Sequence, residues 1–128
     1  MIVYASRTGN VKNVCSKLEG IECVSISDVI NLGENFFIFT YTDGLGEVPQ
    51  HVEEFLRSNN NFFLKGVIAS GNTNFGTKYC LSADKISRKY NVPIVAKIEL
   101  RGTKKDIIKI TKSYDEIIRR EGWNDCNT

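Results

Sequence analysis

The sequence lacks a strong charge of either sign. It has 17 lysine and arginine residues against 15 aspartate and glutamate residues, so its net charge is +2 at pH 7. A balance this close to zero gives no reason to expect a nucleic-acid or membrane-surface partner. Apolar runs are also too short to reach the about 20 residues that cross a bilayer. Because the chain opens directly on a predicted strand, we expect no signal peptide and a cytoplasmic location.

Metal-binding and disulfide patterns are missing as well. The four cysteines, Cys15, Cys23, Cys80 and Cys126, show no C-x-x-C spacing, and the single histidine, His51, is far from them in sequence. A structural zinc site needs clustered ligands. We therefore predict no metal site and four reduced thiols, with Cys15 and Cys80 packed on helix faces.

The common catalytic motifs do not occur either. Neither G-x-G-x-x-G nor G-x-x-x-x-G-K-[ST] is present, which disfavours a dinucleotide-binding fold and a nucleoside triphosphatase. No serine stands in a G-x-S-x-G setting. The acidic residues Asp28, Asp43 and Glu47 are too dispersed for the pocket of a phospho-receiver domain. No catalytic constellation stands out in the sequence.

The chain does have the composition of a globular protein, with 41% hydrophobic and 25% charged residues. We expect a single domain that spans residues 1–128. Apolar runs typical of strands alternate with apolar stripes at helical spacing. The predicted strands span residues 2–5, 21–26, 36–40 and 92–100, and residues 66–69 are the predicted core of a further strand before the last one. The predicted helices cover residues 10–18, a segment with Pro49 in its first turn, a segment from about Tyr79 to Tyr90, and a segment from Thr103 to Gly122.

Alternating strands and helices indicate βαβ units and a parallel sheet. We predict an α/β fold with a doubly wound, five-stranded parallel sheet in the flavodoxin-like order 2-1-3-4-5 and helices on both faces. Such sheets bind ligands outside the carboxyl ends of the strands, at the switch point between the first and third strands. Polar, glycine-containing loops follow the first, third and fourth predicted strands, at residues 6–10, 42–46 and 70–76. All three loops are therefore predicted at one edge of the sheet.

The first loop has the composition of a phosphate site. Ser6, Thr8 and Asn10 supply hydroxyl and amide groups, Gly9 lets the backbone approach closely, and a helix N-terminus follows. The alternative is an ordinary helix cap, in which Thr8 or Asn10 satisfies the first helical turn. The loop by itself leaves both interpretations open.

The middle and third loops are predicted to face a planar group from two sides. Leu45 and Phe75 are apolar loop tips that could cover its faces, whereas Tyr41 is expected to stay in the preceding strand. Simple packing of these tips is the alternative. Taken together, the three loops favour a planar cofactor that carries a phosphate.

Five stretches carry a more specific resemblance, and they span essentially the whole chain. In order, they are Ser6-Arg7-Thr8-Gly9-Asn10-Val11 and residues 40–49, 66–72, 82–86 and 92–94. They resemble the motifs of the flavodoxin-like stimulatory proteins encoded with class Ib ribonucleotide reductases.

This resemblance implies that the chain binds FMN. The phosphate would lie at Ser6, Arg7, Thr8, Gly9, Asn10 and Val11. The isoalloxazine ring would lie between Thr42, Asp43, Gly44, Leu45 and Gly46 on one side and Ser70, Gly71, Asn72, Asn74, Phe75 and Gly76 on the other. The peptide between Gly44 and Leu45 would sit near flavin N5 and respond to reduction, which glycine permits.

The resemblance also implies a function. Reduced FMN would react with O2 and supply a superoxide-type oxidant that assembles the dimanganese–tyrosyl radical cofactor of the class Ib ribonucleotide reductase small subunit. The flavin would carry the chemistry, so the resemblance implies no acid–base catalytic side chain. The implied partners are that small subunit, an electron-donating reductase and O2. The alternative is a generic flavodoxin electron carrier, against which the weakly positive charge argues, because such carriers use acidic faces for steering. A receiver or scaffold domain without flavin is a third reading, against which the three loops argue.

Overall fold

The structure, a computed structural model, describes residues 1–29, 32–43, 46–58 and 60–121. Within these residues, five parallel strands form one sheet in the order β2-β1-β3-β4-β5. The strands are β1 (Ile2–Tyr4), β2 (Cys23–Ser25), β3 (Phe36–Tyr41), β4 (Leu64–Gly71) and β5 (Ile94–Glu99). The predicted strand order and parallel pairing are confirmed.

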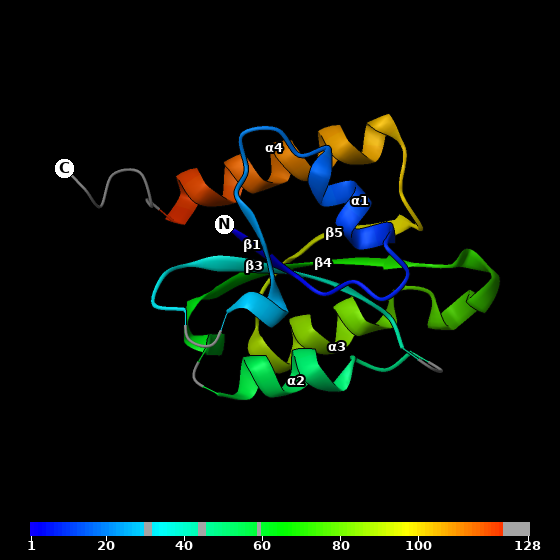
Figure 1. Cartoon of the computed structure of the whole chain (residues 1–128), viewed down its shortest axis with the longest axis horizontal. Helices are drawn as coiled ribbons and strands as arrows, with labels where there is room; N and C mark the ends of the chain where they lie inside the picture. Colours follow the sequence, from blue (N-terminus) through cyan, green and yellow to red (C-terminus); the bar gives the residue numbers. More distant parts are fainter. Residues whose placement is uncertain (30–31, 44–45, 59, 122–128) are drawn as a thin grey trace.

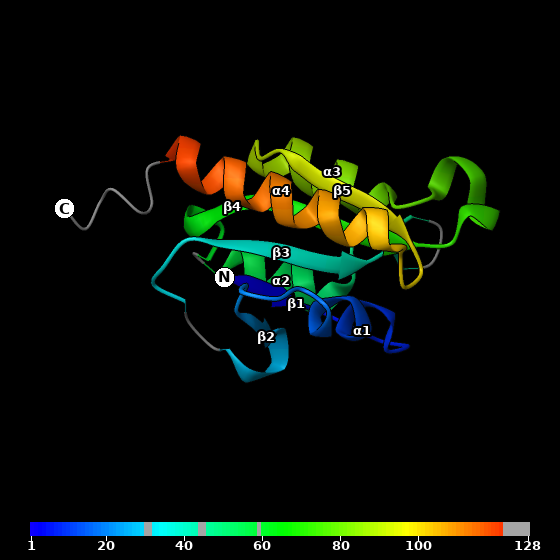
Figure 2. The same cartoon turned by 90° about the horizontal axis from the view of Figure 1, so that it is seen from above.

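Helices cover both faces of this sheet, as predicted. The α-helices are α1 (Asn10–Ser16), α2 (Gln50–Arg57), α3 (Leu81–Tyr90) and α4 (Lys104–Glu121). The 3-10 helices are η1 (Ile26–Asp28), η2 (Asn60–Phe63) and η3 (Thr73–Lys78). Helices α1 and α4 lie over one face and α2 and α3 over the other (Figure 1), and the view from above shows α4 running along the sheet (Figure 2). A membrane-crossing helix is not found among the described residues.

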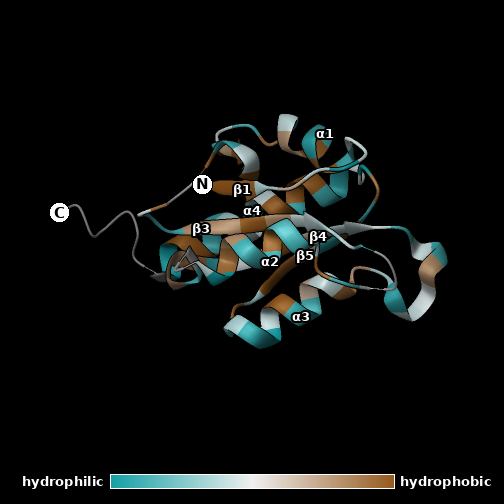
Figure 3. Ribbon diagram, turned by 60° about the horizontal axis from the view of Figure 1, so that its bottom comes forward, coloured by the Kyte–Doolittle hydropathy of each residue, from teal (hydrophilic) through white to brown (hydrophobic). Residues whose placement is uncertain are grey.

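Strand β3 explains why two cores form. Side chains alternate between the two faces of a strand, so Phe37 and Phe39 join the core under α1 and α4. Phe36 and Ile38 join the core against α2 and α3. All of them are fully buried. The uninterrupted apolar run at this strand is therefore the sequence of a central strand covered on both sides, and Figure 3 shows hydrophobic colouring along much of β1 and β3.

The predicted core of the fourth strand, residues 66–69, is confirmed, and β4 extends beyond it from Leu64 to Gly71. Glycine inside a strand reads as an interruption, but here it allows close packing. A Cβ atom at Gly66 would lie 2.8 Å from Cδ2 of Phe37 and 3.0 Å from Cγ2 of Val95. The absent side chain makes room for a phenylalanine of the central strand.

Three strands are shorter than predicted. The first, predicted over residues 2–5, ends at Tyr4. The edge strand predicted over residues 21–26 is reduced to β2, which pairs only with β1 among the described strands. The last strand, predicted over residues 92–100, forms its ladder from Ile94 to Glu99. Leu100 cannot continue it, because its φ of +50° lies in the left-handed region.

Helix boundaries follow the predicted signals with three corrections. Helix α1, predicted over residues 10–18, ends at Ser16. Pro49 occupies the N-cap position of α2 rather than its first turn. Cys80 lies at the N-cap of α3, with φ of +50°, rather than on a helix face. The capping box is confirmed, since Asp106 N–H donates to Thr103 Oγ1 (3.3 Å) and Thr103 N–H donates to Asp106 Oδ2 (2.8 Å). The predicted helix end at Gly122 lies outside the described residues.

Candidate functional site

A hollow of about 640 Å³ opens at the carboxyl ends of β1, β3 and β4. Its walls come from the three loops that the sequence singled out. The predicted residues that line it are Ser6, Arg7, Thr8, Asn10, Val11, Thr42, Asp43, Ser70, Gly71, Asn72 and Phe75. The predicted meeting of the three loops at one edge of the sheet is confirmed.

Some predicted residues do not line the hollow. The described residues Gly9, Gly46, Asn74 and Gly76 belong to the same loops but are not part of its wall. Gly44 and Leu45 lie outside the described residues, so the expected peptide beside flavin N5 is not tested. Residues that the sequence pattern missed also line the hollow, namely Tyr41, Lys78, Tyr79, Cys80 and Leu100.

The first loop leads into α1 through Gly9, whose φ of +89° suits glycine. Gly9 itself holds the N-cap position and has no side chain that could cap the helix. Neither Thr8 nor Asn10 is the N-cap residue, so the interpretation of the loop as an ordinary Thr8 or Asn10 cap is wrong. The nearest substitute is a long hydrogen bond of 3.4 Å from Lys12 N–H to Ser6 Oγ. Because the first N–H groups of a helix have no partner within it, this end of the hollow is suited to an anion.

The first and middle loops are joined across the hollow by Arg7. Its Nη1 donates to Asp43 Oδ1 at 2.7 Å, and its guanidinium lies 5.0 Å from the centre of the Tyr41 ring. Both charged side chains are about half exposed, at 58% and 43%, so this pair stabilises the fold by at most about 1 kcal/mol. The contact is weak enough for a ligand to replace.

Tyr41 contributes a flat ring to the hollow although it is the last residue of β3, as predicted. Burial raises the pKa of its phenol, with the Asp43 carboxylate adding to the effect. The ring therefore stays neutral at neutral pH and offers an apolar surface to a planar group. Strand position alone gave no signal that the ring would face the hollow.

The third loop folds into η3 and carries Phe75 at its tip. Asn72 caps the turn, because its Oδ1 accepts a 2.9 Å hydrogen bond from Asn74 N–H. Glu99 holds Thr73 by accepting from its backbone N–H (3.1 Å) and from its hydroxyl. These two hydrogen bonds lower the pKa of Glu99. Phe75 is 54% exposed at the rim of the hollow.

The floor of the hollow is tightly packed. A Cβ atom at Gly71 would lie 3.0 Å from Cys80 Sγ and 3.2 Å from its backbone nitrogen. Ser70 Oγ donates to the Leu100 carbonyl at 2.6 Å, which draws the end of β5 under the third loop. Burial raises the pKa of the Cys80 thiol to about 11 and also raises the pKa of Tyr79. Both groups are neutral at neutral pH, so the floor carries no formal charge of its own.

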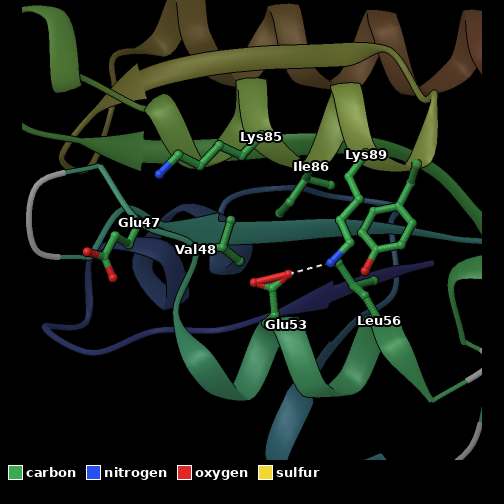
Figure 4. A pocket seen from close by; sticks show the side chains of 8 residues that line it. Glu47, Val48, Glu53, Leu56, Lys85, Ile86 and Lys89 are labelled. Carbon is green, nitrogen blue, oxygen red and sulfur yellow. Dashed lines mark hydrogen bonds and ion pairs between the residues drawn. The ribbon is translucent and has the colours of Figure 1, made fainter.

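A second hollow, of about 330 Å³, lies between α2 and α3 (Figure 4). An ion pair of 2.9 Å between Lys89 Nζ and Glu53 Oε1 spans it, above apolar side chains such as Leu56 and Ile86. Its wall includes Glu47 and Val48, which directly follow the middle polar loop, but among the described residues it contains none from the three loops at residues 6–10, 42–46 and 70–76. Groups of three or more metal-ligating side chains are not found among the described residues.

Known proteins resemble this chain over nearly its full length. Residues 2–112 match the protein family described as NrdI flavodoxin-like. Protein NrdI of Bacillus licheniformis is 41% identical over 119 residues, which cover 93% of this chain and 90% of that protein. The SPbeta prophage-derived protein NrdI of Bacillus subtilis is 40% identical over 119 residues, covering 91% and 92%.

Solved flavodoxins share the fold at lower identity. A short-chain flavodoxin associated with a bacterial microcompartment superposes with a TM-score of 0.69 at 20% identity, covering 93% of this chain and 95% of that one. The Fusobacterium nucleatum flavodoxin bound to flavin mononucleotide superposes with a TM-score of 0.63 at 17% identity, covering 93% and 96%. A flavodoxin-like family implies a flavin as the bound group. The chain belongs to the NrdI family, the flavodoxin-like activators of class Ib ribonucleotide reductase.

Proposed function

We propose that this chain binds FMN in the hollow at the carboxyl edge of the sheet. Residues Ser6 to Val11 would hold the phosphate. Residues Thr42 to Gly46 and Ser70 to Gly76 would hold the isoalloxazine ring. The observation that carries this proposal is the meeting, in one hollow, of a helix N-terminus whose N-cap is Gly9 with the aromatic side chains of Tyr41 and Phe75.

The size and chemistry of the hollow support the proposal. Its volume of about 640 Å³ falls within the about 300–1,000 Å³ typical of small-molecule sites. Among the described residues, nothing lies within 4 Å of the position that a Cβ atom at Gly9 would take, so the loop leaves room beside α1. The residues present therefore fit a group with a phosphate at one end and a flat ring at the other.

Further residues add charge and apolar contact. Arg101 donates from Nε to Asn10 Oδ1 at 3.3 Å, which brings a cation to the phosphate end. Asn10 would then be held in place for the anion by a residue from beyond β5. At the other end, Tyr41 and Phe75 offer aromatic faces to the ring, and offset aromatic contacts favour such stacking.

The chemistry itself would come from the cofactor. Once reduced by an electron-donating reductase, bound FMN would pass electrons to O2 and so supply a superoxide-type oxidant for the dimanganese–tyrosyl radical cofactor of the reductase small subunit. The chain's own residues would bind and orient the ring and leave its rim, at the exposed Phe75, open to O2 and to the small subunit.

The test is assembly of the tyrosyl radical in manganese-loaded small subunit of a class Ib ribonucleotide reductase. Reduced, FMN-loaded protein and O2 are added, and the radical is measured by electron paramagnetic resonance. We expect radical with this chain and background radical with an unrelated FMN-loaded flavodoxin as the matched control. Equal radical yields from the two flavoproteins would refute the dedicated role.

A further inference from the structure

Two cysteines outside the candidate site lie beside each other. Cys15 is on α1 and Cys23 is the first residue of β2. Cys15 is 8% exposed within the core under α1 and α4, and the partly buried Cys23 packs against that same core. The Cys23 thiol lies 4.0 Å from the Cys15 carbonyl oxygen and 3.7 Å from that of Ile21. Both are free thiols.

The two thiols have different chemical character. A hydrogen bond from Cys15 lowers the pKa of the Cys23 thiol. The same hydrogen bond, together with burial, raises the pKa of the Cys15 thiol. The thiolate is the nucleophilic form of cysteine, and it reacts where oxidants reach it. Cys23 is partly exposed whereas Cys15 is buried, so an oxidant reaches Cys23 first, and Cys15 is its buried neighbour.

We propose that Cys15 and Cys23 form a reversible oxidation site, at which hydrogen peroxide converts the two thiols into a disulfide. The Cys23 thiolate attacks one peroxide oxygen, the O–O bond breaks, and the sulfur becomes a sulfenic acid while hydroxide leaves. The Cys15 sulfur then attacks the Cys23 sulfur, the S–O bond breaks, and water forms after proton transfer. In total, two thiols and one peroxide give one disulfide and two waters.

The position of the pair keeps its oxidation away from the hollow. Cys23 pairs with Ile2, the first residue of β1, which is the amino end of the sheet. The hollow opens at the carboxyl end, beyond Tyr4. The disulfide would tie α1 to β2, a short strand at the open edge of the sheet (Figure 2). This inference does not rest on FMN binding, because the oxidant is peroxide itself.

The test treats the reduced full-length chain with hydrogen peroxide, alkylates the remaining thiols after denaturation, and maps them by mass spectrometry. We expect the mass of the chain to fall by two hydrogen atoms and Cys15 and Cys23 to become resistant to alkylation. Dithiothreitol should reverse both changes. Cys23→Ser is expected to slow thiol loss at least about tenfold, as removal of the reactive thiolate implies. Cys15→Ala is expected to leave a Cys23 sulfenic acid that dimedone traps.

Cys80→Ala is the matched control, since Cys80 is a buried thiol in the other core. It is expected to leave the oxidation rate unchanged. The mapping in the unaltered chain decides the question even where a variant fails to fold. Retention of all thiols under peroxide, a disulfide that involves Cys80 or Cys126, or equal slowing by Cys80→Ala and Cys23→Ser would overturn the proposal.

Discussion

Phe75 is a residue whose contribution to ligand binding can be measured apart from its contribution to folding stability. It is 54% exposed at the rim of the hollow, so folding buries only part of its ring. An exposed apolar ring adds little to stability, but it offers a surface that a planar ligand can cover. Its place in the wall of the hollow therefore points to a contribution to binding.

Replacing Phe75 by alanine is expected to weaken FMN binding roughly fivefold, through about 1 kcal/mol of lost stacking. The free energy of unfolding of the apoprotein should change by less than about 0.5 kcal/mol, because the side chain is mostly exposed. Fluorescence titration with FMN and urea unfolding measure the two effects. Phe62→Ala is the control, since Phe62 is 81% exposed and lies outside the hollow. Equal FMN affinity in both variants would contradict the role of Phe75.

For single residues, the sequence predicted those that line the hollow from the three loops. It missed those that reach the hollow through contacts with residues far away in sequence. Ser6, Thr42 and Ser70 were found because each follows a strand and carries a polar group. Leu100 was missed because it reaches the hollow through a hydrogen bond to Ser70, thirty positions away. Tyr41 was placed correctly in its strand, but strand position does not say what a terminal ring faces.

Among the elements, α4 has the clearest local determinant. Its capping box satisfies N–H groups at both ends of the Thr103–Asp106 pair. Its buried side, which includes Ile110, Tyr114 and Ile117, covers the sheet opposite α2 and α3. Both features are local in sequence, which is why they were predictable.

Thr103→Ala is expected to lower the free energy of unfolding by about 1 kcal/mol, because it removes the N-terminal cap of α4. Urea unfolding monitored by circular dichroism measures the change. Lys105→Ala, an exposed substitution on the same helix, is the control and should be nearly neutral. A loss as large in Lys105→Ala as in Thr103→Ala would show that the cap does not stabilise the helix.

Strand boundaries were less predictable than this helix, for a physical reason. Gly66 lies inside β4, where Phe37 and Val95 occupy the space that a side chain at Gly66 would need. Neither residue is near Gly66 in sequence. The local sequence does not distinguish a glycine that ends a strand from a glycine inside a strand that makes room for a ring of a neighbouring strand.

On the scale of the whole molecule, two cores sandwich one sheet, and a buried thiol links the second core to the hollow. Cys80 belongs to the core against α2 and α3 and also lines the hollow. Its Sγ donates to the Ala69 carbonyl at 3.5 Å. Since burial raises its pKa to about 11, the folded state holds this proton more tightly than the unfolded state does.

This difference predicts a loss of stability in base. Cys80 contributes stability in full below its ordinary pKa near 9, and that contribution falls as the pH rises towards 11. The titration of Cys80 changes the free energy of unfolding by at most about 1.4 kcal/mol per pH unit. Urea unfolding between pH 8 and pH 10.5 should show a shallower loss in Cys80→Ala than in the unaltered chain. Parallel curves would contradict the raised pKa.

The central claim is that the hollow holds FMN with its phosphate against Ser6 to Val11. The most direct measurement is a fluorescence titration of the apoprotein with FMN and with riboflavin, which lacks the phosphate. We predict that FMN binds at least about tenfold more tightly than riboflavin, and that a Ser6→Ala, Thr8→Val double variant reduces FMN affinity while riboflavin affinity stays unchanged. Binding of neither flavin, or equal affinity for the two, would contradict the account.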